Sequence, residues 1–312
     1  MKHWVLIALL SGCAFGDPDD DEMESLKQAA TSLNGVSLNG VSLNGVSLNG
    51  VSLNGVSLNG VSLNGVSLNG VTLNASKISA KNPAGQTITG AALVGSTFSG
   101  TLSNGTTMNL RVDSVTQGTG VNADMWLYGV SYENAGTWAR LCGSDTSTPS
   151  KPILATPVTG EWNYATGVTG GGSYTADPAR FTFACRGTAI AKCVEMGYKQ
   201  WKTAGGVNLQ NHMVACTRML RADYCGNGTS YTANGKQVDL YDNLGVQIDT
   251  QGWNIEAEWT ASGARCVAYG LDTRLHASAK YTVACYNAKK SYSCGSRSNF
   301  GSGTLIMSET NY

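Results

Sequence analysis

Charge is scarce in this 312-residue chain. Its 21 basic and 21 acidic side chains make up 13% of the residues and cancel to a formal net charge of zero, whereas glycine occurs 39 times. This composition points away from a helical cytosolic enzyme and favours a β-rich, exported chain with room for about two domains. The sequence also contains no Gly-x-Ser-x-Gly elbow, no phosphate-binding loop and no dinucleotide fingerprint, which excludes the enzyme classes that depend on them.

The N-terminal stretch MKHWVLIALLSGC has the features of an export signal. A positive charge at Lys2 precedes an apolar run over residues 4–10 that is too short to span a bilayer. Leu10-Ser11-Gly12-Cys13 resembles the bacterial lipobox, in which the cysteine becomes the lipidated first residue of the mature protein. The alternative is an ordinary signal peptide with an accidental cysteine. We expect residues 1–12 to be a lipoprotein signal peptide and Cys13 to be the lipidation site.

The residues after Cys13 predict a membrane tether. Ala14 stands where the inner-membrane retention pattern has aspartate, so we expect an outer-membrane lipid anchor, on the periplasmic or the external face. A like-charge run cannot join a core and stays solvated, which predicts a lipidated acidic tether over residues 13–31. A calcium site in this run is the alternative. The run contains Asp17, Asp19, Asp20, Asp21, Glu22 and Glu24.

A five-residue repeat follows the tether. Leucine recurs at every fifth position from Leu33 to Leu73, a period that fits neither a helix nor a flat strand. The V-S-L-N-G unit resembles the pentapeptide-repeat family, which implies a short right-handed, four-sided β-solenoid over residues 32–100 with Val and Leu pointing inward. A flexible Gly/Ser/Asn linker is the alternative. No charged residue occurs between Lys27 and Lys77, which argues against mimicry of nucleic acid by acidic faces.

The C-terminal region alternates strand and helix patterns. Hairpin turns are indicated at residues 133–136, 233–235 and 261–263, and several hairpins at this spacing suggest an antiparallel sheet. Residues 188–201 and 207–224 carry apolar side chains at helical intervals, with Gly205-Gly206 between them. The predicted fold class is therefore α+β: a disulfide-stapled antiparallel β domain with a helical hairpin, preceded by the solenoid.

Eight cysteines remain after Cys13, and an even count in an exported chain predicts disulfides. If the two helices form a hairpin about residue 205, Cys193 and Cys216 are nearly equidistant from the loop, and so are Cys185 and Cys225. We therefore predict the pairs Cys193–Cys216 and Cys185–Cys225. The pairing of the other four stays open; they are Cys142, Cys266, Cys285 and Cys294.

The run Arg221-Ala222-Asp223-Tyr224-Cys225-Gly226 resembles the signature of the ADYC domain, a family named for its four central residues, here Ala222, Asp223, Tyr224 and Cys225. The family occurs largely in predicted exported proteins of myxobacteria and their relatives. The similarity extends through Tyr241-Asp242-Asn243-Leu244-Gly245 and implies an ADYC domain over residues 101–312. The resemblance names the domain without implying an activity.

Candidate catalytic and metal-binding residues are few. The mature chain has two histidines, His212 and His276, and His212 lies four residues before Cys216 on a predicted helix. His212 and Cys216 could together bind zinc, or Cys216 could act as a nucleophile with His212 as its base. Because a disulfide is the stronger expectation for Cys216 in an oxidising compartment, we predict no metal and no cofactor.

Two carboxylates on a predicted strand resemble a glycosidase pair. Glu256 and Glu258 alternate in WNIEAEW and so point to one face about 7 Å apart. Charged residues on the wet side of an amphipathic strand are commoner, and that is our expectation here. For Asp223 we expect a structural role: hydrogen bonds to backbone amides at the end of its helix or in a neighbouring loop, or pairing with Arg218 or Arg221.

The predicted partners follow from charge and aromatic content. Residues 101–312 carry 17 basic and 15 acidic side chains, which gives no reason to expect nucleic acid. Strand aromatics are a better lead, because some could line a face that binds glycan or an envelope protein. They are Trp126, Tyr128, Trp138, Trp162, Tyr164, Trp253 and Trp259. The favoured hypothesis is an outer-membrane or surface lipoprotein with a binding or structural role in the envelope. The alternative is a secreted-type hydrolase using Asp223 with His212, or Glu256 with Glu258.

Overall fold

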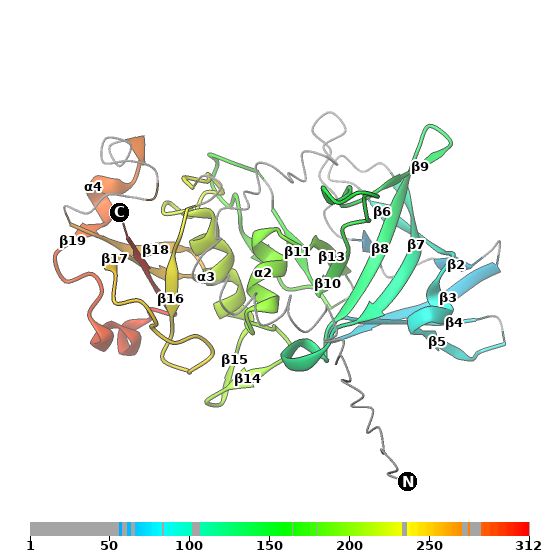
Figure 1. Ribbon diagram of the computed structural model, residues 1–312, viewed down its shortest axis with the longest axis horizontal. Coiled ribbons are helices and arrows are strands. Elements are labelled where there is room, and N and C mark those ends of the chain that lie inside the picture. The colour runs from blue at the N-terminus through cyan, green and yellow to red at the C-terminus, as the bar shows by residue number, and fades with distance from the viewer. Residues whose placement is uncertain are drawn as a thin grey trace, which may run out of the picture.

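A computed structural model describes residues 56–57, 61–63, 66–82, 84–101, 107–163, 165–178, 180–232, 236–269, 274 and 282–311. These residues form mostly antiparallel β-sheets with few helices. The two helices of a helical pair lie between a large sheet and a small one (Figure 1). The predicted signal peptide, Cys13, the tether and residues 32–55 of the repeat lie outside the described residues.

The large sheet runs in the order β1-β13-β10-β8-β7-β6-β2-β3-β4-β5, with β9 paired to β8, and its strand pairs are antiparallel. Its strands are β1 (Val56–Ser57), β2 (Val61–Leu63), β3 (Val66–Asn74), β4 (Lys77–Lys81), β5 (Thr87–Thr89), β6 (Ser96–Thr101), β7 (Thr107–Gln117), β8 (Trp126–Asn134), β9 (Thr137–Arg140), β10 (Ala155–Thr159) and β13 (Arg180–Cys185). Short 3₁₀ turns, η2 (Gly90–Leu93) and η3 (Gly120–Asn122), lie at its margins. The hairpin predicted at residues 133–136 is confirmed as β8–β9.

The described residues at the end of the repeat form antiparallel hairpins. In the β2–β3 hairpin Leu63 lies opposite Val66, and in the β3–β4 hairpin Asn74 lies opposite Lys77, both antiparallel, whereas a four-sided coil stacks its strands in parallel. Between β3 and β4 the chain reverses because Ala75 takes a left-handed φ of 56°, as tight hairpin turns require. The solenoid over residues 32–100 stays a prediction, because most of the pentapeptide copies lie outside the described residues. The predicted boundary after residue 100 falls at the end of β6, which pairs with β7 in the same sheet.

The large sheet has an apolar core of its own. Along β7, Leu110 and Val112 are fully buried while Arg111 between them is not, which is the period-2 pattern of a strand with one face covered. Ile78 from β4 and Phe181 from β13 are also fully buried in this core. Each such side chain contributes about 1.5–3 kcal/mol by leaving water.

The helical pair occupies the positions that the sequence predicts, but both helices are shorter than expected. They are α2 (Ala189–Glu195) and α3 (Gln210–Arg221). Gly197, with φ 103°, ends the first and Ala222, with φ 52°, ends the second. The connection is a small hairpin of β14 (Thr203–Ala204) and β15 (Val207–Asn208) around Gly205-Gly206, both at positive φ. Helix α2 packs on β13 and α3 packs on the small sheet.

The small sheet runs in the order β16-β20-β17-β18-β19. All of its pairs are antiparallel except β18–β19, and the hairpin predicted at residues 261–263 is confirmed as β17–β18. The hairpin predicted at residues 233–235 lies outside the described residues. The strands are β16 (Asp239–Tyr241), β17 (Asn254–Thr260), β18 (Gly263–Ala268), β19 (Lys290–Ser291) and β20 (Ile306–Thr310); α4 (Tyr286–Lys289), η5 (Arg297–Ser302) and the separate pair β11 (Glu161–Trp162) and β12 (Tyr174–Thr175) complete the described elements.

The eight cysteines form four disulfides: Cys142–Cys185, Cys193–Cys216, Cys225–Cys285 and Cys266–Cys294. The predicted Cys193–Cys216 pair is confirmed, with its Cα atoms 5.8 Å apart between α2 and α3.

The predicted Cys185–Cys225 pair is wrong. Mirror symmetry about the loop holds only within the helices, and both of these cysteines lie outside them. Cys185 is the last residue of β13, and Cys225 follows the left-handed residue Ala222, which turns the chain away from the axis of α3. The four disulfides indicate an extracytoplasmic protein. Among the described residues no helix is long and apolar enough to cross a membrane.

Candidate functional site

The ADYC signature forms the turn at the end of α3. Ala222 adopts the left-handed conformation after the last helical residue, and its N–H bonds to the carbonyl of Met219 at 2.9 Å. The N–H of Asp223 then bonds to the carbonyl of Arg218 at 2.9 Å. A left-handed residue at this position closes a helix by satisfying its last carbonyls. The signature therefore begins as a helix stop.

Asp223 holds the loop that follows this stop, as the sequence predicts. The side chain is fully buried, and its carboxylate accepts hydrogen bonds from the N–H groups of Asn227, at 3.1 Å, and Gly228, at 2.9 Å. Arg218, also buried, pairs with the same carboxylate at 2.5 Å. Arg218 donates a further bond from Nε to the carbonyl of Ala261 at 2.7 Å, in the β17–β18 turn. One ion pair thus joins a helix end, a loop and a hairpin.

Glycines allow two loops to close over this ion pair. A Cβ at Gly172 would lie 3.0 Å from both Arg218 Nη1 and Asp223 Oδ2. A Cβ at Gly228 would lie 2.1 Å from the carbonyl oxygen of Ala165, closer than any side chain tolerates. Both glycines also have positive φ, 68° and 81°. The backbone of these loops therefore seals the Arg218–Asp223 pair from solvent.

Tyr224 connects the signature to Glu256. Its hydroxyl donates to Glu256 Oε1 at 2.7 Å, and its ring stacks on Trp259 at 5.3 Å. Burial, with the charge of Glu256 next, raises the pKa of Tyr224 well above its ordinary value, so the hydroxyl stays a donor. Arg274 pairs with both oxygens of Glu256 at 2.8 Å, and Ser308 donates to Oε2 at 2.7 Å. Glu256 is thus fully hydrogen-bonded inside the fold.

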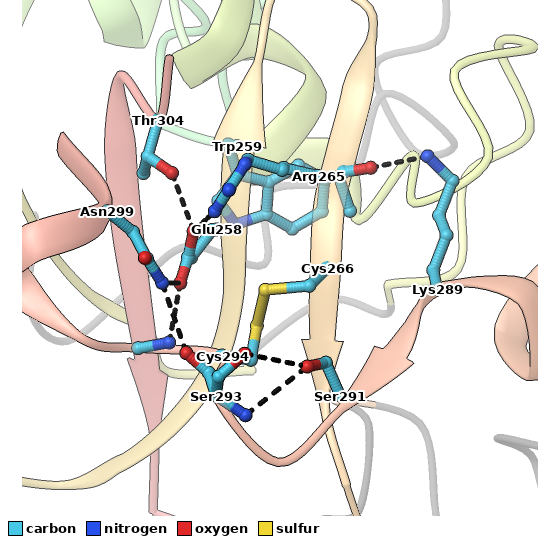
Figure 2. The surroundings of a disulfide bond; sticks show 12 residues. Glu258, Trp259, Arg265, Cys266, Lys289, Ser291, Ser293, Cys294, Asn299 and Thr304 are labelled. Atoms are coloured by element: carbon cyan, nitrogen blue, oxygen red, sulfur yellow. Dashed lines mark hydrogen bonds and ion pairs between the residues drawn. A yellow bond between two sulfur atoms is a disulfide. The ribbon is translucent and has the colours of Figure 1, made fainter. Parts of the chain in front are cut away.

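Glu258 has a separate set of donors, shown in Figure 2. Its Oε1 accepts from Gly295 N–H at 2.7 Å and from Asn299 Nδ2 at 2.6 Å. Its Oε2 accepts from Arg265 Nη1 at 2.7 Å and from Thr304 Oγ1 at 2.6 Å. Burial opposes ionisation of Glu258, but these donors outweigh it and hold its pKa below the ordinary value.

The two carboxylates do not form an open pair, and the expectation that they lie on the wet side of a strand is wrong. Glu256 is 1% exposed and Glu258 is 0% exposed. The simple alternation fails because β17 has a bulge between Ile255 and Ala257 against β20 and another after Glu258 against β18. Among the described residues, no donor forms hydrogen bonds to both Glu256 and Glu258.

His212 is packed inside the helical pair. It is 2% exposed and stacks on Tyr198 with ring centroids 6.2 Å apart, and in the part of the chain that the structure describes neither ring nitrogen has a hydrogen-bond partner. Burial lowers its pKa, which keeps the ring neutral. Cys216 is bonded to Cys193 and therefore offers no thiolate for zinc or for nucleophilic attack. The other candidate, His276, lies outside the described residues.

A cavity of about 150 Å³ opens elsewhere, between the large sheet and α2. The ion pair of Arg186 and Glu195, at 2.8 Å, stands in its wall. None of the four predicted catalytic candidates lines it. No sequence motif marks this cavity, because its walls come from separate segments of the chain. The lining residues are Thr116, Gln117, Gly118, Thr119, Asn122, Met125, Leu127, Leu154, Arg186 and Glu195.

Three of the seven strand aromatics are buried in the core, and Tyr164 lies outside the described residues. Tyr128, Trp162 and Trp259 are buried, whereas Trp138 is 37% exposed with the Arg111 guanidinium 4.5 Å from its ring centroid. Sequence reasoning missed a more exposed pair. Tyr269 and Tyr292 are 48% and 83% exposed, and their rings stack at 4.0 Å. No motif marks this pair, since its members lie in different segments brought together by β18 and β19.

These contacts define a class: mostly antiparallel β proteins, cross-linked by disulfides, with the ADYC sequence closing a helix over a buried arginine–aspartate pair. The chain belongs to the ADYC domain family, whose profile matches residues 90–272, more than half of its length. Eight copies of the pentapeptide repeat match residues 31–70. No curated protein and no solved structure gives a significant match.

Proposed function

We propose that this protein is an outer-membrane or surface lipoprotein that binds a partner or builds structure in the bacterial envelope. Cys13 would carry the lipid, and the acidic tether would hold the rest of the chain away from the membrane surface. The ADYC domain would present the binding face. The four disulfides support the extracytoplasmic part of this proposal, and the lipobox sequence supports the anchor.

One observation carries the preference for binding over hydrolysis. A catalytic acid or base must lie within hydrogen-bond reach of a substrate. Asp223, Glu256 and Glu258 are instead buried and hold the fold together through described hydrogen bonds and ion pairs. His212 is buried against Tyr198. These side chains can be removed only at a cost in stability, which is the behaviour of structural residues.

The exposed tyrosine pair is the binding face that we favour. Tyr269 and Tyr292 offer a stacked aromatic surface, and the Lys290 ammonium lies 5.7 Å from the centroid of the Tyr269 ring. Aromatic rings with a polar rim suit the apolar faces of sugar rings as well as protein partners. A glycan or a protein of the envelope is therefore the proposed partner.

The anchor is tested by expressing the full-length chain and Cys13→Ser in a Gram-negative host. Wild type should incorporate labelled palmitate and fractionate with the outer membrane, and Cys13→Ser should lose both properties. Equal membrane association of the two proteins, with no label in either, would rule out lipid anchoring.

The binding face is tested with the same chain and purified peptidoglycan sacculi or outer-membrane vesicles. The double variant Tyr269→Ala/Tyr292→Ala should bind about tenfold more weakly, the equivalent of about 1.4 kcal/mol. Val121→Ala, an exposed apolar change in η3 at the margin of the large sheet, should bind like wild type. Release of soluble fragments from sacculi by wild type, but not by a folded Glu256→Gln variant, would overturn the proposal in favour of hydrolysis.

A further inference from the structure

Three carboxylates meet at the edge of the small sheet. Asp239 in β16 lies directly opposite Glu309 in β20, and Asp249 comes from the turn that follows β16. One carboxylate oxygen from each lies within 4.8 Å of the other two. Asp239 and Glu309 are 1% and 4% exposed. Like charges placed opposite each other in neighbouring strands destabilise a sheet, so this arrangement requires a positive counterpart.

The described donors to Asp239 supply no positive charge. Its Oδ2 accepts from Thr250 N–H at 2.9 Å, Thr250 Oγ1 at 3.2 Å and Gln251 N–H at 2.9 Å. Its Oδ1 accepts from Leu240 N–H at 2.9 Å. These bonds fold the turn onto β16, which brings Asp249 beside the two strand carboxylates.

Glu309 has an oxygen that the fold leaves unsatisfied. The Tyr241 hydroxyl and the Trp253 backbone N–H donate to this side chain, but Oε2 is buried with no hydrogen-bond partner among the described residues. Burial, followed by the charge of Asp249, raises the pKa of Glu309. A buried acceptor without a partner is costly, and it indicates a missing ion or proton at that position.

One described cation faces the cluster. Arg297 pairs with Asp249 at 2.7 Å, its side chain is 64% exposed, and its guanidinium lies 4.6 Å from the Tyr241 ring centroid. One arginine against three carboxylates leaves two negative charges in excess, largely shielded from water. This excess equals the charge of a divalent cation.

We propose that Asp239, Asp249 and Glu309 bind a calcium ion. Calcium takes oxygen ligands at about 2.3–2.6 Å, so ligands on opposite sides of the ion are about 4.6–5.2 Å apart. One oxygen from each of the three carboxylates lies within 4.8 Å of the other two, so a single ion of this size can contact all three. Magnesium demands near-ideal octahedral geometry at about 2.0–2.1 Å and gives up its water reluctantly, so three carboxylates from separate segments suit calcium better. Water completes the coordination sphere on the side of Asp249, whose side chain is 26% exposed.

The compartment suits such a site. The disulfides indicate that the protein works outside the cytosol, where calcium-binding modules function at dissociation constants of about 10⁻⁴–10⁻³ M. Bound calcium would join the first and last strands of the small sheet to the turn between residues 249 and 252. The site is independent of the proposed envelope partner, and either proposal can fail alone.

Calcium titration of the oxidised, chelator-treated full-length protein at pH 7 tests the site. The midpoint of thermal unfolding of wild type should rise saturably, by about 3–5 °C at ten times the dissociation constant. Magnesium should have a smaller effect. Terbium luminescence, sensitised by Tyr241 and Trp253 beside Glu309, should appear and then fall as calcium displaces the terbium.

Two variants locate the ion. Glu309→Gln and the more exposed Asp249→Asn should lose the calcium response, and in chelator Glu309→Gln should melt above wild type because carboxylate repulsion is relieved. Glu133→Gln, a matched loss of one exposed carboxylate, should keep the full response. An unchanged response in Glu309→Gln and Asp249→Asn would place calcium elsewhere, for example on the acidic run of residues 17–24, and overturn the proposal. No calcium response in wild type would assign the unsatisfied oxygen to a shared proton and would also overturn it.

Discussion

Two halves of the described structure are stabilised by different means. The sheet half, residues 56–185, is a broad antiparallel sheet over an apolar core and contains one disulfide, Cys142–Cys185. The signature half, residues 186–311, has short strands and helices and contains the other three disulfides. The signature half also has an apolar core, and its three disulfides and buried charge pairs add to the stabilisation that this core provides.

Two ion pairs of the signature half are more deeply buried than the described pairs of the sheet half. In the sheet half, the side chains of the pairs Arg111–Asp113 and Arg180–Glu161 are 27–49% exposed. In the signature half, the side chains of Arg218–Asp223 and Arg274–Glu256 are 0–4% exposed. Exposed pairs contribute little to stability, whereas breaking a buried pair leaves an uncompensated charge. The family signature therefore marks the place where this half is most sensitive to substitution.

The largest expected effect is from Arg218→Met. Loss of the guanidinium leaves Asp223 charged and buried, which should lower the free energy of unfolding by about 3–5 kcal/mol. The matched change in the sheet half, Arg180→Met, should cost less than about 1 kcal/mol because its pair with Glu161 is exposed. Urea unfolding of the two variants makes the comparison. Equal losses would remove the contrast between the halves.

Disulfide removal should have the next largest effect. Replacing both cysteines of a bridge by alanine should cost about 2–4 kcal/mol, more for a longer closed loop. The separations are 60 residues for Cys225–Cys285 and 23 for Cys193–Cys216. The first loss should therefore exceed the second by about 1 kcal/mol. Thermal unfolding of the two double variants measures this, and the reverse order would show that strain or packing outweighs loop entropy.

Removal of the Tyr128 hydroxyl, in the sheet half, should lower the free energy of unfolding by a smaller amount. Tyr128→Phe removes the acceptor for the buried N–H of Ile78, which bonds to the hydroxyl at 2.8 Å, and should cost about 1–3 kcal/mol. Faster hydrogen exchange at the Ile78 amide would identify the cause. Tyr132→Phe in the same strand is the control, since no hydrogen bond is described for that hydroxyl, and it should be nearly neutral. A neutral Tyr128→Phe would mean that water replaces the acceptor.

The smallest expected effect on stability comes from Asp124, which joins the sheet half to the signature half through its hydrogen bonds. Burial opposes ionisation of Asp124, but hydrogen bonds from Lys199, Trp201 and Lys202 outweigh it and lower its pKa to about 2. A depressed carboxyl pKa stabilises the fold above the unfolded value of about 4, and this stabilisation disappears as pH falls toward 2. Asp124→Asn should therefore cost about 1–2 kcal/mol at pH 7 and almost nothing near pH 2. A pH-independent difference would show that charge is not the cause.

The sequence predicted features that depend on local pattern. The helical pair, the hairpins at residues 133–136 and 261–263, and the Cys193–Cys216 bridge follow from residue spacing within adjacent elements. Asp223 has the contacts expected for it because those partners lie within five residues of it along the chain.

The errors arose where distant segments decide the outcome. Glu256 and Glu258 were expected on a solvent-exposed strand face, but both are buried. The bulges in β17 shift the alternation of its side chains, and Ser308 and Thr304, from distant segments, donate to the two carboxylates. Cys225 forms its disulfide with Cys285, which lies sixty residues further along the chain, and the spacing of nearby residues does not indicate this pairing. The carboxylate cluster was missed for the same reason, because Asp239 and Glu309 meet only through the pairing of β16 with β20.

Disulfide mapping of the oxidised native protein, digested without reductant, tests most directly whether the signature half is covalently locked outside the cytosol. We expect linked peptides for Cys193–Cys216, Cys225–Cys285 and Cys266–Cys294, together with Cys142–Cys185 from the sheet half, and no free thiol among these eight. Free thiols at Cys225 and Cys285, or a bridge joining Cys185 to Cys225, would contradict it.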